Sequence, residues 1–456
     1  MKKSLLPCLV VLLFCTQASA QLINYKGKDF FINGINIPWN VYGRDFGTHY
    51  QNGALYDSAW FENTFTQLQN SGINCARMWL HTDGCATPEF DTNGYVTGLD
   101  SNFFANLDDF FARAQKHNIM IIPSLWDFYM FKDNSALGMY GGMHADLIQD
   151  TAKSRSYINN ALIPMVQRYA NQCNLLAWEV MNEPEWAMNI PSGGTTAQVV
   201  QAYEMQRFAG MVAEAVHQHS PKMVTIGSAS LMYSSEKFTF TTPCIGNYWK
   251  DQALQSAYNS PLAYMDFYQI HYYDWMTGLV DFDPFDLSHP VSFWMLDKVT
   301  LIGETQGNSN THGSQEMLNN AYSGNYAGVM FWSFSAGADS MGQFSDFSWA
   351  NDGFADAHHA IVDFDSTLCA TTTAIAESVL KNAVRIYPNP AANELSISGI
   401  SGTSTIKMYD VLGSLVVMKQ TSVNCSIDVS QLPQGLYAVE IENSRGKKRE
   451  KVLIAY

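Results

Sequence analysis

The stretch that decides the fold is Ala177-Trp-Glu-Val-Met-Asn-Glu-Pro-Glu-Trp186. An apolar run leads directly into Asn182 and Glu183, so a carboxylate stands where a buried strand is expected to end. A glutamate at the end of a single strand is more often a solvated loop residue than a functional group. Its meaning depends on whether other strands of the same chain end in matching polar residues.

Eight short apolar runs, this one included, divide residues 21–364. They are Ile32–Pro38, Cys75–Leu80, Ile119–Leu125, Leu175–Asn182, Met223–Ser228, Phe267–Tyr273, Val299–Thr305 and Gly328–Phe334. Most are continuously apolar, as parallel strands covered on both faces are. Amphipathic helical patterns lie between them, as in Ser101–His117 and Thr196–His219. The pattern predicts an α/β fold, a (β/α)8 TIM barrel over residues 21–364. A doubly wound sheet is the alternative, but no strand precedes a GxGxxG or P-loop motif.

The composition is that of a globular protein with a large core. The 456 residues are 47% hydrophobic and 13% aromatic. The net charge of -16 argues against a nucleic-acid partner, because phosphate binding needs a basic surface. The cysteines are scattered and include no CxxC pair, so neither a zinc site nor another metal or cofactor is expected. We expect Cys75 and Cys173 to be small buried hydrophobic residues.

Both ends of the chain carry features of export. Residues 1–20 have two lysines, an apolar run and Ala18-Ser19-Ala20, which predicts a signal peptide cleaved after Ala20. No later segment has 18 uninterrupted apolar residues, so no membrane span is expected. After a Thr-rich linker over residues 365–383, short alternating strands predict a small all-β sandwich over residues 384–456. This tail is slightly basic, so the acidity belongs to the barrel.

The tail resembles the C-terminal sorting domain of the type IX secretion system. The matching stretches are Tyr387-Pro-Asn-Pro-Ala391, Tyr409-Asp-Val-Leu-Gly413, Leu432-Pro-Gln-Gly-Leu-Tyr437 and Lys447-Lys-Arg449 before a short final strand. The resemblance implies recognition by the secretion machinery and export through the periplasm, to the medium or the cell surface. A carbohydrate-binding sandwich is the alternative, but the tail contains no tryptophan on which a sugar could stack.

The predicted strands of the barrel end in polar and aromatic residues. These are Trp39, Arg77, Trp79, Trp126, Asp127, Asn182, Glu183, His271, Tyr273, Glu304 and Trp332. Chemistry in such barrels lies at the C-terminal ends of the strands. The fourth and seventh strands contribute Glu183 and Glu304, and two carboxylates suit glycoside hydrolysis.

The two glutamates are expected to have different roles. Arg77 and Tyr273 would keep Glu304 ionised as a nucleophile. Glu183, with Pro184 and Trp186 forming an apolar wall behind it, would keep its proton as the acid/base. Asn182 would hold the sugar 2-hydroxyl, and His271 would modulate the proton of Glu183.

Five motifs in this order resemble glycoside hydrolase family 5 of clan A. Asn182-Glu183-Pro184 is similar to the acid/base motif and Ile302-Gly303-Glu304 to the nucleophile strand. His271-Tyr272-Tyr273, Arg77 and Trp332 are similar to the family's His-x-Tyr, strand-two arginine and strand-eight platform. The resemblance implies a retaining glycosidase. The chain departs from it at Leu125-Trp126-Asp127, where many members have a histidine.

Other polar and aromatic residues have structural interpretations. We expect Glu179 to pair with a barrel cation, Glu185 to lie on a loop surface, and His358-His359 to lie on a helix surface. Trp178 and Trp294 are expected in the core. The His81-Thr-Asp-Gly84 stretch is compatible either with a sugar subsite or with a simple turn.

Tryptophans suggest the substrate. Seven of them follow strand ends and are expected to line one cleft: Trp39, Trp79, Trp126, Trp186, Trp249, Trp275 and Trp332. Aromatic faces bind pyranose rings, and a row of them suits a linear β-linked polysaccharide. Arg77–Gly84 and Met139–Gly142 are more similar to the β-mannanases of the family than to its cellulases. A secreted, monomeric endo-β-1,4-mannanase is therefore predicted, with an endo-β-1,4-glucanase (cellulase) as the alternative.

Two rival classes remain at this point. A metal-dependent barrel hydrolase would need a His-x-His on the first strand, which here ends Asn36-Ile-Pro-Trp39. A non-catalytic glycan-binding barrel would not need the complete set of supporting groups around two glutamates.

Overall fold

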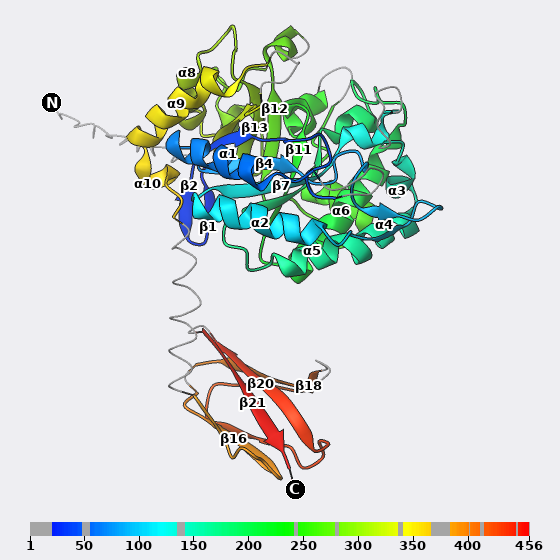
Figure 1. The fold of residues 1–456 in the computed structure, drawn as a ribbon, viewed down its shortest axis with the longest axis vertical. Helices are drawn as coiled ribbons and strands as arrows, with labels where there is room; N and C mark the ends of the chain where they lie inside the picture. Colours follow the sequence, from blue (N-terminus) through cyan, green and yellow to red (C-terminus); the bar gives the residue numbers. More distant parts are fainter. Residues whose placement is uncertain are drawn as a thin grey trace, which may run out of the picture. The chain divides into compact units, whose positions relative to one another are not determined.

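The chain forms two compact units, residues 1–364 and 365–456 (Figure 1). The computed structural model describes residues 21–47, 55–134, 142–240, 245–278, 282–335, 341–365, 384–400, 402–410, 415–443 and 446–455. The predicted signal peptide and almost all of the predicted linker lie outside these residues.

The first unit is built on a closed parallel barrel. Its strands are β3 (Ile32–Asn36), β4 (Cys75–Trp79), β7 (Met120–Asp127), β8 (Ala177–Asn182), β11 (Met223–Ser228), β12 (Tyr268–Tyr272), β13 (Thr300–Gln306) and β14 (Gly328–Trp332). They follow one another in this order around the barrel, and β14 pairs with β3 to close it. Each predicted apolar run contains or overlaps one of these strands, so the predicted (β/α)8 fold is confirmed.

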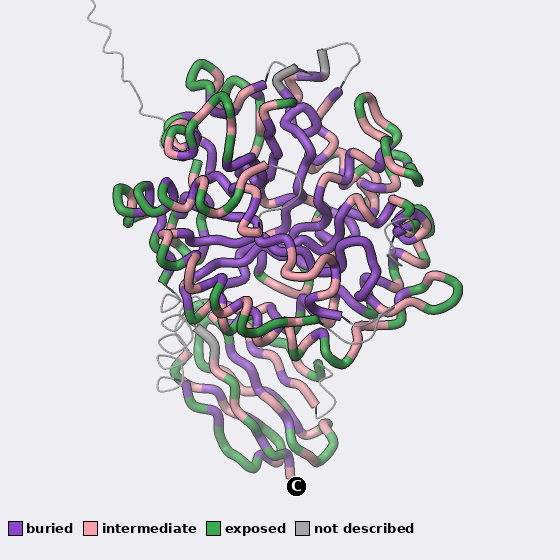
Figure 2. The backbone as a smooth tube through the Cα atoms, turned by 45° about the horizontal axis from the view of Figure 1, so that its top comes forward, coloured by how far each residue is buried: buried purple, intermediate pink, exposed green. Residues whose placement is uncertain are grey.

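Helices cover the outside of the barrel. They are α1 (Ser58–Asn70), α2 (Phe103–Lys116), α3 (Ala145–Gln149), α4 (Thr151–Tyr157), α5 (Ile163–Arg168), α6 (Ala202–His219), α7 (Asp251–Tyr258), α8 (Ser314–Ser323), α9 (Phe344–Ala357) and α10 (His359–Val362). In α2 the buried residues Phe103, Leu107, Phe110 and Ala114 recur every three or four positions and face the strands. Figure 2 shows the result, with buried strands inside and helices exposed on their outer sides. None of the helices in the described residues is long and apolar enough to cross a membrane.

The core confirms some expectations and corrects one. Trp178 and Trp294 are buried, as predicted. Cys75 is a free, buried thiol, also as predicted. Cys173 is buried but disulfide-bonded, so the expectation that it is simply a small hydrophobic residue is wrong. The sequence reveals the oxidising destination of the chain but not which thiols meet, because pairing depends on distant contacts.

The second unit consists of two antiparallel sheets around one core. The strands are β15 (Arg385–Tyr387), β16 (Glu394–Ser398), β17 (Ser404–Tyr409), β18 (Leu415–Thr421), β19 (Cys425–Asp428), β20 (Gly435–Asn443) and β21 (Gly446–Ile454). The sheet orders are β15-β16-β19 and β18-β17-β20-β21. Alternate residues such as Ile406, Met408, Val439 and Ile441 form the shared core. This is the predicted all-β fold, except that Lys447-Lys-Arg449 lies within β21 rather than before it.

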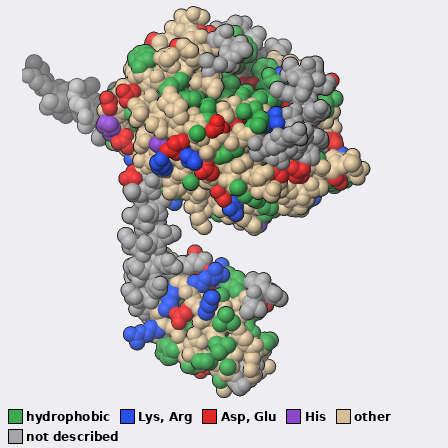
Figure 3. All heavy atoms as spheres, in the orientation of Figure 1, with side chains coloured by type: hydrophobic (Ala, Val, Ile, Leu, Met, Phe, Trp, Pro, Cys, Tyr) green, Lys and Arg blue, Asp and Glu red, His purple; other side chains and the backbone are tan. Residues whose placement is uncertain are grey.

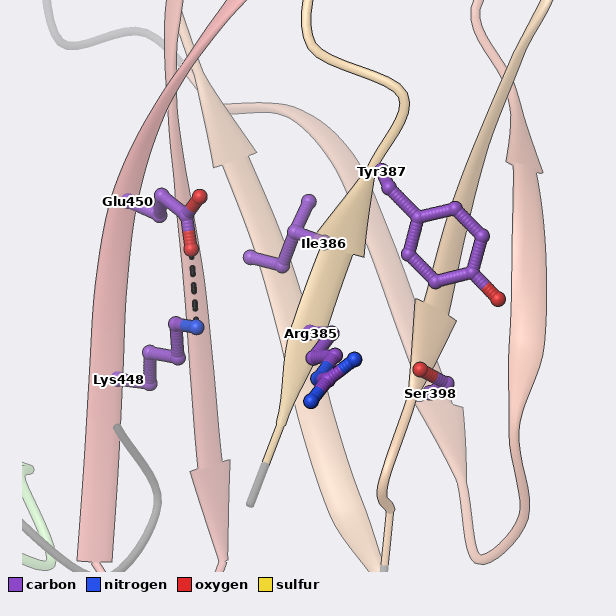
Figure 4. A pocket seen from close by; sticks show the side chains of 6 residues that line it. All are labelled: Arg385, Ile386, Tyr387, Ser398, Lys448 and Glu450. Carbon is purple, nitrogen blue, oxygen red and sulfur yellow. Dashed lines mark ion pairs between the residues drawn. The ribbon is translucent and has the colours of Figure 1, made fainter. Parts of the chain in front are cut away.

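Basic side chains are prominent on the surface of this second unit (Figure 3). A shallow hollow there is lined by Arg385, Ile386, Tyr387, Ser398, Lys448 and Glu450 (Figure 4). Lys448 pairs with Glu450 at 2.9 Å and donates a hydrogen bond to the Val384 carbonyl. The lysine is thus engaged within the sheet.

Candidate active site

A cavity of about 480 Å³ opens where the barrel strands end. It is lined by Trp39, Tyr42, Trp79, Asp127, Phe128, Tyr129, Asn182, Glu183, Trp186, Tyr273, Trp275, Glu304, Trp332 and Met341. Eight of the predicted site residues are therefore brought together. Arg77 and His271 are fully buried and contact the carboxylates of this cavity.

Glu183 occupies a sharp corner after β8. Its backbone is left-handed, with φ 47° and ψ 50°, and its amide donates to the Gly227 carbonyl on β11 at 2.7 Å. The corner starts the short helix η4 (Pro184–Ala187). Trp186 in η4 donates its indole N–H to Glu183 Oε2 at 2.8 Å. The expected apolar wall is therefore wrong in one respect, because Trp186 offers Glu183 a hydrogen-bond donor.

Glu304 lies on β13, buried among cationic and donor groups. His271 Nδ1 is 2.7 Å from Glu304 Oε2, and an Arg77 guanidinium nitrogen is 3.6 Å away. Burial alone would raise the pKa of Glu304, but the charges of His271 and Arg77 and a hydrogen bond from Tyr273 outweigh it and lower the pKa. The arrangement keeps this carboxylate ionised, as the sequence predicts.

His271 stands between the two glutamates. Its Nδ1 is 2.8 Å from Glu183 Oε1 and 2.7 Å from Glu304 Oε2. Burial alone would lower the pKa of His271, but the two carboxylates have the larger effect and raise the pKa to about 9. Nδ1 of His271 therefore faces both carboxylates. One oxygen of Glu183 and one oxygen of Glu304 lie within 4.8 Å of each other and of this nitrogen.

Glu183, His271 and Glu304 are close enough together to bind a metal ion, and no other such group occurs among the described residues. A metal needs an imidazole without its proton. The raised pKa of His271 means that Nδ1 keeps its proton near neutrality, so the geometry suits sharing of a proton better than coordination.

Arg77 supports the site from inside the barrel. It forms a two-point ion pair with Glu179, with both N···O distances at 2.6 Å. A third bond of 2.6 Å runs to Asn182 Oδ1. Glu179 is thus the structural partner of a barrel cation, as predicted. A side chain at Gly227 would meet Arg77 at 2.7 Å and Glu179 at 2.8 Å, so this close approach requires glycine there.

Five of the seven predicted tryptophans line the cavity. Trp39, Trp79 and Trp332 meet edge to face, with ring centroids 5.7–6.5 Å apart. Trp275 is 47% exposed and Trp186 adjoins Glu183. The five are Trp39, Trp79, Trp186, Trp275 and Trp332.

Two of the predicted cleft tryptophans are core residues. Trp126 is fully buried against His81 and Tyr157, so its expected role in sugar binding is wrong. Successive side chains of a strand point to opposite faces, and it is Asp127 that faces the cavity. Trp249 is also fully buried, and its N–H donates to Glu185.

The expectation that Glu185 lies on a loop surface is wrong. It is fully buried and accepts hydrogen bonds from Ser228, the Ala229 amide and Trp249. Burial raises its pKa despite these donors. Glu185 therefore ties the loop that carries Glu183 to the end of β11.

Three histidines considered in the sequence, His81, His358 and His359, do not line the cavity. His81 is fully buried and packs on Phe103, and burial lowers its pKa to about 3. The turn interpretation of residues 81–84 thus holds at His81. His359 is exposed, as predicted, whereas His358 is half-buried against Phe354.

Sequence reasoning missed several cavity residues: Tyr42, Phe128, Tyr129 and Met341, with Asp127 noted at a strand end but given no role. Extending each strand end by a few loop residues would have found Tyr42, Phe128 and Tyr129. Met341 carries no comparable signal, because it lies well beyond the end of β14.

Trp126 and Trp332 should respond differently to truncation. Trp126→Ala removes a buried ring and should cost about 3–5 kcal/mol of stability. Trp332→Ala removes an aromatic face from the cavity and should slow turnover of β-linked polysaccharide by roughly 1–3 kcal/mol, the value for a base stacked on an aromatic side chain. Thermal melting and steady-state kinetics on both variants test this. A Trp332→Ala protein with normal kinetics and a collapsed melting temperature would make Trp332 a core residue.

Known proteins share this architecture. Residues 39–337 match the family described as cellulase (glycosyl hydrolase family 5). A mannan endo-1,4-beta-mannosidase of Mytilus edulis is 32% identical, over 76% of this chain and 94% of its own. The enzyme of that name from Cryptopygus antarcticus is 30% identical, over 72% and 87%. The crystal structure of an Eisenia fetida endo-1,4-beta-mannanase superposes with a TM-score of 0.64, at 29% identity, covering 73% of this chain and 94% of its own.

Residues 385–455 match the secretion system C-terminal sorting domain. The predicted resemblance of the tail is confirmed, and the protein is a secreted or cell-surface one. The closed barrel, the paired glutamates and the family match over most of the chain all point to one family for the first unit. This chain belongs to glycosyl hydrolase family 5, and it is a glycosidase.

Proposed function

We propose that the barrel is a retaining endo-β-1,4-mannanase in which Glu304 is the nucleophile and Glu183 the acid/base. One observation carries this assignment: both glutamates face the same aromatic-walled cavity, and each has an oxygen within 2.8 Å of His271 Nδ1. Retention requires two carboxyl groups about 5–5.5 Å apart, whereas inversion requires roughly 6.5–9.5 Å. Oxygens within 4.8 Å support retention.

In the first step Glu304 attacks the anomeric carbon while Glu183 protonates the departing glycosidic oxygen. The lowered pKa of Glu304 keeps it ionised for this attack. A protonated Glu183 can accept the His271 bond and the Trp186 bond only through its free lone pairs, and its own O–H remains for the substrate.

In the second step the charge of Glu304 has been consumed in the ester bond. His271 then faces only one carboxylate, Glu183, which has become anionic by giving up its proton. Glu183 takes a proton from a water molecule that attacks the anomeric carbon, and the bond to Glu304 breaks, so that the negative charge returns to Glu304 beside the imidazolium of His271. The bridging position of His271 thus fits both halves of the reaction.

Mannan is proposed as the polysaccharide because the two relatives and the crystal structure described above are all named for that activity. The tryptophans of the cavity suit the flat faces of β-linked pyranose rings. Cellulose is the second candidate, since the family description itself names cellulase.

The substrate is tested by reducing-end release from soluble β-mannan and from carboxymethylcellulose. We expect cleavage of mannan at least tenfold faster, with oligosaccharides as early products and no loss on treatment with EDTA. Faster cleavage of the cellulose derivative would replace mannan by glucan. Glycan binding without cleavage would instead support the non-catalytic alternative.

Azide distinguishes the two glutamates. With an activated aryl β-mannoside, Glu183→Ala should still form the glycosyl-enzyme, because the leaving group needs little acid assistance. Added azide should then give the β-glycosyl azide. Glu304→Ala cannot form that intermediate, so azide should attack directly and give the α-azide. NMR assignment of the products tests the roles, and the opposite anomers would reverse them.

Export is proposed to proceed through the periplasm and then through the secretion machinery that recognises the sorting domain. The tail has its own core and matches that domain, which supports an independent role. Deleting residues 384–456 should leave an active barrel retained in the cell envelope. Activity assays on medium and cell fractions test this, and wild-type secretion of the truncated protein would contradict it.

A further inference from the structure

Asp127 ends β7 and lines the cavity, yet the mechanism above gives it no task. Its side chain is buried, only 4% of the residue being exposed. A buried carboxylate is unfavourable unless several donors satisfy it. Its partners therefore indicate why it is there.

Three N–H groups converge on this carboxylate. Asp127 Oδ2 accepts from Trp79 Nε1 at 3.1 Å and from Asn182 Nδ2 at 2.7 Å. Oδ1 accepts from the Tyr129 amide at 2.7 Å, at the start of the short helix η1 (Phe128–Phe131). Trp79, Asn182 and Tyr129 all line the cavity. One side chain thus joins the cavity ends of β4, β7 and β8.

Arg77 holds two of these residues from the opposite side. Its guanidinium donates to Asn182 Oδ1 at 2.6 Å and lies 4.2 Å from the ring centroid of Trp79. The Asn182 amide therefore has a donor at its oxygen and an acceptor at its nitrogen, which fixes its orientation. Trp79 is likewise held by its face and by its N–H. Asn182 immediately precedes Glu183, so its position is transmitted directly to the acid/base corner.

We infer that Asp127 is a positioning residue for the glycosidase reaction, which holds Trp79 and Asn182 in register with Glu183. The inference rests on the proposed role of Glu183. Only an acceptor-only group can receive all three N–H groups, since an amide would turn its own N–H₂ toward a donor. A misplacement of about 1 Å at a reacting centre can cost on the order of a hundredfold in rate.

The charges around Asp127 allow a second readout. Burial raises the pKa of Asp127 to about 7, the three N–H donors oppose this, and the charge of Glu183 adds to it. Lys132, after η1, and Tyr42, in the loop after β3, also interact electrostatically with Asp127. Because Asp127 and Glu183 interact as like charges, a neutral residue at position 127 would remove one negative charge from beside the proposed acid.

The test compares Asp127→Asn with Asp83→Asn. Asp83 is also buried and accepts from a backbone amide, of Cys85, and from a side-chain amide, of Asn134, but it lies outside the cavity. We expect Asp127→Asn to lower kcat about 10–100-fold, to change KM less than about threefold, and to move the alkaline limb of the pH profile to lower pH. Asp83→Asn should lose stability while kcat and the pH profile hold.

Asp127→Glu separates position from charge. It keeps the negative charge but moves the acceptor oxygens by one methylene, so kcat should fall while the alkaline limb stays in place. It also serves if Asp127→Asn does not fold. In addition, Trp79→Phe should cost less kcat in an Asp127→Ala background than in the wild-type protein, because alanine leaves no acceptor for the hydrogen bond that Trp79→Phe removes.

The inference would be overturned if Asp127→Asn and Asp83→Asn both lost kcat in proportion to their loss of melting temperature. An unchanged kcat in both Asp127 variants would also overturn it. Equal cost of Trp79→Phe in the two backgrounds would also overturn it. All measurements use whichever polysaccharide the wild-type protein cleaves. Failure of the mannan proposal therefore appears in the wild-type protein, and failure of this inference appears only in the variants.

Discussion

The site depends on one buried cation. Arg77 is fully enclosed in the barrel and satisfies Glu179 at two points, Asn182 at a third, and the charge of Glu304 at longer range. Removing one partner of a buried ion pair typically costs ~3–5 kcal/mol, because the other charge is left uncompensated. Three strands of the barrel, β4, β8 and β13, are therefore held in one arrangement before any substrate binds, and this arrangement sets the positions of Glu183 and Glu304.

The barrel could be predicted because its signal is local. Each strand is a short apolar run, and the rule that strand ends meet at one rim converts eight separate runs into one site. Glu183 and Glu304 are far apart in the sequence, yet that rule alone brings them together. The register of β12 and β13 places His271 directly opposite Glu304.

The errors share a different cause. Trp126 and Asp127 are neighbours in the sequence, and their side chains point to opposite faces of β7. The sequence does not show which of the two faces the cavity. Glu185 looks like a loop residue because its partners Ser228 and Trp249 come from distant segments. Sequence patterns show which residues lie near the ends of the strands. The hydrogen-bond partners of a residue and the direction in which its side chain points depend on tertiary packing.

The left-handed corner at Glu183 bears on how such a residue is retained. Placing a residue with a Cβ in this conformation costs roughly 1–2 kcal/mol of conformational free energy, and glycine or asparagine adopts it at a lower cost. Selection for a stable fold alone would therefore tend to remove the glutamate from this position. The acid/base role proposed for Glu183 gives a reason to keep it there, and a library of variants ranked by thermal stability alone would be expected to select against this glutamate.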